Sequence, residues 1–139
     1  MATPGENFQL LTDYYAAYGA GGPEGIARMA RFYAKDKPAY IAGNSELSGN
    51  INNTEEAVKY LLRLQELNGG NIKLVGSPTL LVVGDTMVAA LINEQHTRPG
   101  KPPLIVPRLC VYEIANGKLS RAFVWQLESQ AFDDYYPRS

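Results

Sequence analysis

The chain has 139 residues, 45% hydrophobic and 19% charged, and its thirteen basic and fourteen acidic residues leave a formal charge of −1. This balance argues against nucleic acid or an anionic membrane surface as the main partner, because both require a basic field. A single cysteine excludes an internal disulfide and a structural zinc cluster, and no apolar run is long enough to span a bilayer. We therefore expect one cytoplasmic domain over residues 1–139, without a signal peptide, that binds a small hydrophobic molecule.

The first third of the chain predicts two helices. A capping-box pattern at residues 3–6 begins the first, whose buried face carries Leu11, Tyr14, Tyr15 and Tyr18. Glycines end this helix, and a second begins near Pro23. Such an aromatic stripe most often belongs to the core; the alternative is that one phenol donates a hydrogen bond into a cavity.

A short strand near Tyr40, and a turn or second short strand between residues 43 and 49, precede a third helix. Asn53 or Thr54 caps this helix, and residues 68–70 end it. Residues 71–85 predict a long strand that bends at residues 76–78. Three further strands fill residues 86–128, joined by RPGKPP and by the hairpin signal ANG. A short helix or tail follows.

Helices followed by hairpin-connected strands indicate an α+β fold, in which a curved antiparallel sheet wraps on three N-terminal helices and encloses a pocket. The turn positions predict that His96 lies opposite Leu104 and that Ile92 lies opposite Arg108. In the next hairpin they predict Arg108 opposite Val124 and Leu104 opposite Glu128, so that His96 and Glu128 share a face.

Three segments resemble the SnoaL-like polyketide cyclases of the nuclear transport factor 2 and ketosteroid isomerase superfamily. They are DYYAAYGAGGPEGIARMARFYAKD, SGNINNTEEAVKYLLRL and VYEIANGKLSRAFVWQLESQAFDDYY. The resemblance covers nearly the whole chain and implies a cone-shaped α+β barrel, often a homodimer, with a ligand cavity between sheet and helices. It also implies acid–base chemistry without a metal or other cofactor, although this fold carries many reactions.

Two subgroups of that superfamily fit poorly. Tyr14 stands where a ketosteroid isomerase has its oxyanion-stabilising tyrosine, but residues 41–43 and Leu109 offer no carboxylate for its base and second acid. A limonene-type epoxide hydrolase requires an Arg–Asp pair near residues 94–97 and an aspartate near Trp125, and both are missing.

The strands gather five polar candidates toward one end of the sheet: Glu94, His96, Arg108, Gln126 and Glu128. We predict that Glu128 orients His96 for proton transfer, because a histidine–carboxylate pair works near neutral pH. The alternatives are a hydrogen-bonded histidine at a strand end and a glutamate that begins the terminal helix.

Tyr40 or Tyr14 is predicted to stabilise negative charge on the substrate oxygen, with a wall aromatic as the alternative role for Tyr40. Trp125, Arg108, Gln126 and Phe32 are predicted to contact the substrate. The alternative role for Arg108 is a structural ion pair with Glu94 or Glu128. The alternative for Trp125 is packing in the core or in a dimer interface.

Together these residues predict a cyclase that closes a ring of a hydrophobic, oxygenated natural-product intermediate by aldol chemistry or by opening an epoxide. The alternatives are a non-catalytic binding module of the same fold, and an isomerase or epoxide hydrolase.

Overall fold

The computed structural model describes residues 3–19 and 22–138. Helices and short strands come first, and the long strands follow. In chain order the elements are α1 (Pro4–Gly19), α2 (Gly22–Ala30), β1 (Ala39–Ile41), β2 (Gly49–Ile51), α3 (Thr54–Leu67), β3 (Lys73–Leu74), β4 (Thr79–Val83), β5 (Met87–His96), β6 (Leu104–Ala115), β7 (Lys118–Gln126) and α4 (Ser129–Tyr135). This order confirms the predicted α+β fold.

The helix starts follow from their capping residues. Before α1, the Thr3 hydroxyl accepts a hydrogen bond from the Glu6 amide, and the Thr3 amide donates to the Glu6 carboxylate, both at 3.2 Å. Before α3, the Asn53 side chain accepts from the Glu56 amide at 2.9 Å. Each cap satisfies amides that the first helical turn leaves without a partner, which fixes where the helix begins.

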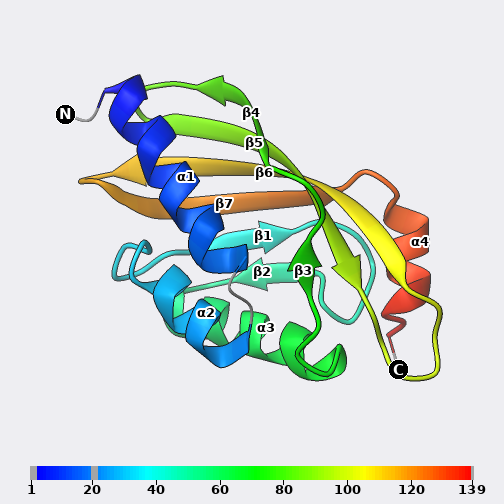
Figure 1. The fold of residues 1–139 in the computed structure, drawn as a ribbon. Coiled ribbons are helices and arrows are strands. Elements are labelled where there is room, and N and C mark those ends of the chain that lie inside the picture. The colour runs from blue at the N-terminus through cyan, green and yellow to red at the C-terminus, as the bar shows by residue number, and fades with distance from the viewer. Residues whose placement is uncertain (1–2, 20–21, 139) are drawn as a thin grey trace.

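The strands form one curved sheet in the order β2-β1-β7-β6-β5-β3, with β4 also paired to β5. The pairings are antiparallel except that of β1 with β7, which is parallel, so the sheet is mixed. Figure 1 shows α1 lying along the long strands, α2 and α3 below them, and α4 beside the far end of β5 and β6. The first three helices therefore cover one face of the sheet, and their apolar residues share a core with it.

The register of the first long hairpin is as predicted, with His96 opposite Leu104 and Ile92 opposite Arg108. The second hairpin differs, because Arg108 lies opposite Gln126 rather than Val124. The offset is two residues, so the predicted faces are kept. Glu128, however, lies beyond the end of β7 instead of opposite Leu104.

A β-bulge at Ser120 sets this register. Asn116 and Gly117 form the two-residue turn with positive φ angles of 52° and 71°, which leaves Ala115 opposite Lys118. Continued without interruption, that pairing would place Trp125 opposite Arg108. The ladder instead shifts between Glu113 and Ile114, leaving Ser120 as the extra residue, and Gln126 takes the inner position.

Burial alternates along β5, β6 and β7, so one face of these strands is buried against the helices and the other is more exposed. The described helices include none long and apolar enough to cross a membrane. The expected cytoplasmic location stays a prediction.

Candidate functional site

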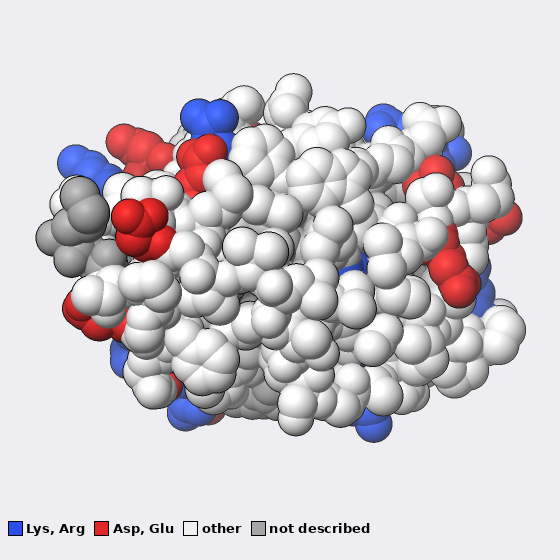
Figure 2. Space-filling view, turned by 90° about the horizontal axis from the view of Figure 1, so that it is seen from above, with Lys and Arg blue, Asp and Glu red and all other residues white. Residues whose placement is uncertain are grey.

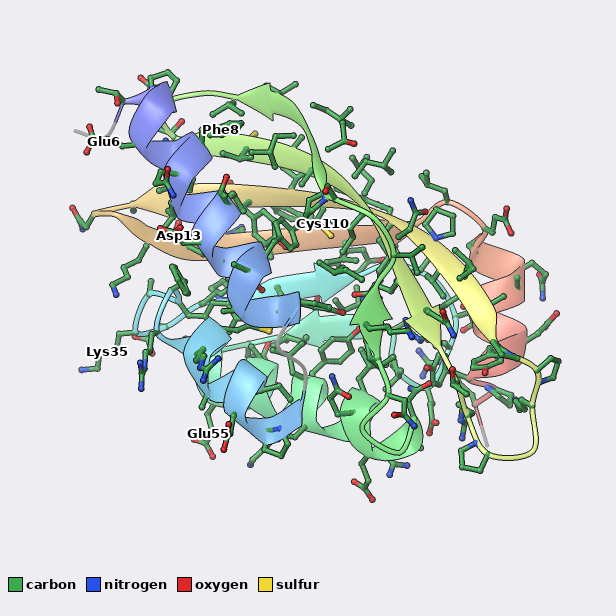
Figure 3. The ribbon with its side chains drawn as sticks, viewed as in Figure 1. Glu6, Phe8, Asp13, Lys35, Glu55 and Cys110 are labelled. Carbon is green, nitrogen blue, oxygen red and sulfur yellow. The ribbon has the colours of Figure 1, made fainter. Side chains whose placement is uncertain are left out.

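A cavity of about 60 Å³ lies between the inner face of the sheet and the first three helices. Cys110 on β6, which lies between α1 and the sheet in Figure 3, lines its floor. Among the described residues, its polar lining consists mainly of tyrosines: Tyr14, Tyr15, Tyr18, Tyr33, Tyr60 and Tyr112. Lys37, Glu94 and Arg108 complete that polar lining. The predicted pocket between sheet and helices is therefore present, although it is small.

Four of the tyrosines are hydrogen-bonded in pairs. The Tyr14 and Tyr33 hydroxyls lie 2.9 Å apart, and those of Tyr15 and Tyr112 lie 2.8 Å apart. Burial raises the pKa of all four phenols, so they are neutral near pH 7. Each pair has one proton more than its mutual hydrogen bond uses, and that proton can be donated to a ligand oxygen.

Glu94 and Arg108 form a buried ion pair in the cavity wall, with Arg108 Nη1 at 2.9 Å from Glu94 Oε1. Tyr18 donates to the other oxygen of Glu94, and Arg108 donates to the Tyr60 hydroxyl at 2.8 Å. Burial alone would raise the pKa of Glu94, but the Arg108 charge and the hydrogen bonds of His96 and Tyr18 lower it to about 2. Glu94 is therefore ionised, and it is a weak base.

His96 lies behind this pair, fully buried, and is not among the described residues that line the cavity. Its Nε2 is 2.9 Å from Glu94 Oε1, and its Nδ1 is 2.5 Å from the Tyr136 hydroxyl. The predicted partner Glu128 is exposed just before α4 and makes no capping hydrogen bond there. The predicted His96–Glu128 pair is therefore wrong, because the bulge in β7 and the early end of that strand move Glu128 out of reach.

Arg108 has the structural ion pair that the sequence offered as its alternative role, and Gln126 supports it. With its amide oxygen toward Arg108, Gln126 accepts from Nη2 at 3.0 Å and donates to the Ala42 carbonyl at 2.9 Å. Gln126 is buried at the inner face of β7 but does not line the cavity. Its predicted contact with substrate is not supported by this position.

Three other predicted site residues lie away from the cavity. Tyr40 is 40% exposed and Trp125 38% exposed, because alternation along β1 and β7 turns both to the outer face. Trp125 stacks there on Phe123 with ring centroids 6.0 Å apart. Phe32 packs edge-on against Tyr14 at 5.9 Å without lining the cavity. Of the predicted catalytic residues, only Tyr14 lines the cavity.

Sequence reasoning missed Lys37, a buried lysine that lines the cavity. Its Nζ lies 4.1 Å from the centroid of the Tyr33 ring, and burial lowers its pKa from 10.5 to about 8. The local sequence KDKP reads as a solvated loop, so nothing in its pattern signalled burial. The partners Tyr18, Tyr60 and Tyr136 were also missed, since each lies far along the chain from the residue it bonds.

A second space of about 560 Å³ lies outside the first, between α1 and the segment that carries β3 and β4. Its described lining is mainly apolar and includes Phe8, which points toward β4 in Figure 3. Tyr15 lines both spaces. Within residues 3–19 and 22–138, no three His, Cys, Asp or Glu side chains lie close enough together to hold a metal ion.

Comparison with known proteins gives a fold. No family model and no curated protein matches the sequence. Among solved structures, Bal32a from a soil-derived mobile gene cassette is similar with a TM-score of 0.84 at 20% identity, covering 95% of this chain and 97% of that one. A nuclear transport factor 2-like protein of unknown function from Burkholderia pseudomallei has a TM-score of 0.80 at 12% identity, covering 96% and 98%.

A protein from Mesorhizobium loti described as a putative SnoaL-like polyketide cyclase [carbohydrate phosphatase] has a TM-score of 0.65 at 18% identity, covering 84% of this chain and 96% of that one. At these identities the likeness concerns the fold alone. It confirms the nuclear transport factor 2-like and SnoaL-like fold expected from the sequence, a fold that hosts both enzymes and binding proteins.

Proposed function

We propose that this chain, which has the fold of nuclear transport factor 2-like proteins, is an acid–base enzyme of cyclase or isomerase type. Its substrate is a small, oxygenated, hydrophobic molecule, and its chemistry needs no cofactor. The observation that carries the proposal is the cavity between sheet and helices, which tyrosines line beside a buried ion pair. Hydroxyl donors held in place inside a dry cavity stabilise negative charge on oxygen better than water does.

Tyr14 is the group we assign to the substrate oxygen. Its hydroxyl is bonded to that of Tyr33, so the pair can turn one proton toward an enolate or an opening epoxide. This suits aldol-type ring closure and epoxide opening equally. Either reaction requires that Tyr14 stay protonated, which burial ensures by raising its pKa.

The properties of Glu94 limit the range of substrates. Its oxygens are occupied by Arg108, His96 and Tyr18, and its pKa of about 2 makes it a poor proton acceptor. Efficient general bases have a pKa near the working pH. The substrate should therefore already be acidic, such as a 1,3-dicarbonyl compound or an enol, so that water can accept its proton while Tyr14 hydrogen-bonds the oxygen that becomes negative. The volume of the cavity limits the part of the substrate that it holds to a few heavy atoms.

Proton exchange tests this assignment directly. We expect the protein to accelerate hydrogen–deuterium exchange at the central carbon of a small 1,3-diketone, measured by NMR in D₂O. Tyr14→Phe should lower the accelerated rate about a hundredfold, as the loss of one oxyanion donor does. Tyr40→Phe is the matched control, because it removes an exposed phenol away from the cavity. If the diketone binds in the cavity but exchanges no faster than in buffer, the non-catalytic binding module is the correct function.

We also propose that the protein is a homodimer formed through the outer face of the sheet. Tyr40, Phe123 and Trp125 meet on this face through the pairing of β1 with β7, and Ile105 and Leu127 add further exposed apolar surface. Figure 2 shows that the side of the molecule away from α2 and α3 has few charged side chains near its centre. Exposed apolar patches of this kind favour association, and a second copy offers the same surface.

Light scattering tests the dimer. The wild type should have the mass of two chains, and Trp125→Glu should shift it to one chain by burying a charge in the interface. Leu62→Glu is the control, because Leu62 is 42% exposed on α3, away from the outer sheet face. A wild-type mass of one chain would refute the dimer.

A further inference from the structure

Lys37 is a buried cation for which the described residues supply no counter-charge. The residue is 4% exposed, and its Nζ lies over the face of the Tyr33 ring, 4.1 Å from the centroid. No ion pair joins it to any acidic side chain in the described part of the chain. A buried ammonium without a negative partner costs free energy, so it persists where something else offsets the cost.

The other charges of the cavity are already matched. Glu94 is used by Arg108, and its remaining oxygen accepts from Tyr18. The pKa values of Tyr14, Tyr33 and Tyr60, which line the cavity with Lys37, are raised because these phenols are buried. Burial also raises the pKa of Cys110 to about 11, so its thiol is neutral at pH 7. With Lys37 protonated, the cavity therefore has a surplus of one positive charge.

The backbone holds Lys37 in this position. Its amide donates to the Thr54 hydroxyl at 2.8 Å, and that hydroxyl donates to the Ala34 carbonyl at 2.7 Å. On the other side, the Pro38 carbonyl accepts from the Ala122 amide at 3.2 Å. Lys35, two residues earlier, is exposed and points away from the body of the protein in Figure 3. The inward position of Lys37 is thus a property of an anchored segment and not of a mobile surface lysine.

We propose that Lys37 and the neighbouring tyrosine hydroxyls form a binding site for a small monoanion whose charge lies on carboxylate or enolate oxygen. An anionic oxygen beside the ammonium neutralises the surplus charge, and the phenols donate hydrogen bonds to its remaining lone pairs. The inference rests on the proposed function in taking the cavity as the ligand site. It goes further by specifying the charge of the ligand, which the enzyme and binding-module hypotheses leave open.

Acetate and acetamide provide a matched test, because they have the same size and shape and differ in charge. Both are titrated into the protein while backbone amide NMR shifts around the cavity are followed. At about pH 6.5 we expect acetate to bind about tenfold more tightly than acetamide. Lys37→Met should abolish this preference, whereas Lys35→Met should leave it unchanged. Lys37→Arg should keep the preference and, unlike the wild type, retain it at about pH 9.5, because guanidinium stays charged there.

The possible failures are distinguishable. Equal binding of both probes by the wild type would refute the anion site and leave the cavity as a ligand site. Preference for acetate that survives in Lys37→Met would refute the role of Lys37. If neither probe shifts the cavity amides, the proposed function fails with the inference. Should Lys37→Met not fold, the pH dependence of the wild type compared with Lys37→Arg still decides the question.

Discussion

Arg108 reaches diagonally across the sheet to Glu94: its backbone lies opposite Ile92, yet its Nη1 is 2.9 Å from the Glu94 carboxylate on the neighbouring strand. Diagonal neighbours on one sheet face are within reach of long side chains. This one contact orients the wall of the cavity, because Tyr18, Tyr60 and His96 all bond to one of the two partners.

Glu94→Gln should lower the free energy of unfolding by about 3–5 kcal/mol, because it leaves the buried Arg108 guanidinium without a counter-charge. Urea unfolding at pH 7 measures the change. The matched control is Glu55→Gln, which removes an exposed carboxylate paired to Lys59 and should cost less than about 0.5 kcal/mol.

Glu94→Gln should also change how the free energy of unfolding depends on pH in the acid range. The pKa of Glu94 is lowered by folding, so its contribution is present above its ordinary value of 4.5 and is lost as pH falls toward about 2. The stability of Glu94→Gln should therefore fall less than that of the wild type over this pH range. Equal acid sensitivity in the variant and the wild type would contradict the assignment of the ion pair.

Lys37→Met should make the protein more stable at pH 7. The unfolded chain keeps the Lys37 proton up to pH 10.5, whereas the folded chain releases it from about pH 8, so wild-type stability rises with pH between these values. The stability of the variant lacks this rise with pH. At pH 7 its free energy of unfolding should exceed that of the wild type by up to about 3 kcal/mol. The difference between the two urea-unfolding curves, measured from pH 7 to 10.5, isolates Lys37 from the tyrosines. A variant that is less stable at pH 7 would contradict the buried, unpaired charge.

Tyr136→Phe should destabilise the protein by about 1–3 kcal/mol, because the lost hydroxyl leaves the buried His96 Nδ1, now at 2.5 Å from it, without a partner. Asn68 Nδ2, at 2.7 Å, would keep only its second hydrogen bond, to the Leu64 carbonyl. Thermal unfolding compares it with Tyr40→Phe, whose exposed phenol should matter little. Similar unfolding temperatures for the two variants would mean that the hydrogen bonds of the Tyr136 hydroxyl do not contribute to stability.

Deletion of Ser120 should leave the protein folded, because Ser120 is the extra residue of the bulge. Without it, Leu119 and Arg121 still lie opposite Ile114 and Glu113, and the inner and outer faces of β7 are kept. Ser120→Ala keeps the chain length and loses only the 3.0 Å hydrogen bond to the Glu113 carbonyl, so it should also fold. Amide NMR dispersion distinguishes a folded protein from an unfolded one; a poorly dispersed spectrum for the deletion alone would refute the assignment of Ser120 as the extra residue.

The bulge also explains which parts of the fold the sequence predicts and which it does not. Helix caps, the Asn116-Gly117 turn and strand alternation are local signals, and they predicted the elements, the fold class and the first hairpin register. The bulge at Ser120 has no local signal, and it accounts for one residue of the two-residue offset in the second hairpin. The other residue comes from centring the turn on Asn116 instead of between Asn116 and Gly117. This offset underlies the predicted pairing of His96 with Glu128. Glu94, two residues before His96 on the same strand face, was the partner that alternation alone could have identified.

The inner site was harder to predict because its contacts join distant parts of the chain. Tyr18 bonds Glu94, and Tyr60 bonds Arg108, only after the helices dock on the sheet. Burial of Lys37 depends on the anchoring of its loop by Thr54, which a pattern of charged and polar residues does not reveal. Packing, and not local preference, decides which side chains face the cavity.

Tyr15 lines two spaces of very different size, about 60 Å³ inside and about 560 Å³ outside. Its hydroxyl is hydrogen-bonded to that of Tyr112, and its ring packs against those of Tyr14, Tyr18 and Tyr112. Because Tyr15 belongs to both linings, we expect a smaller side chain at this position to join the two spaces. A chamber for a few atoms would then become a channel for an extended molecule, with the sheet left as it is.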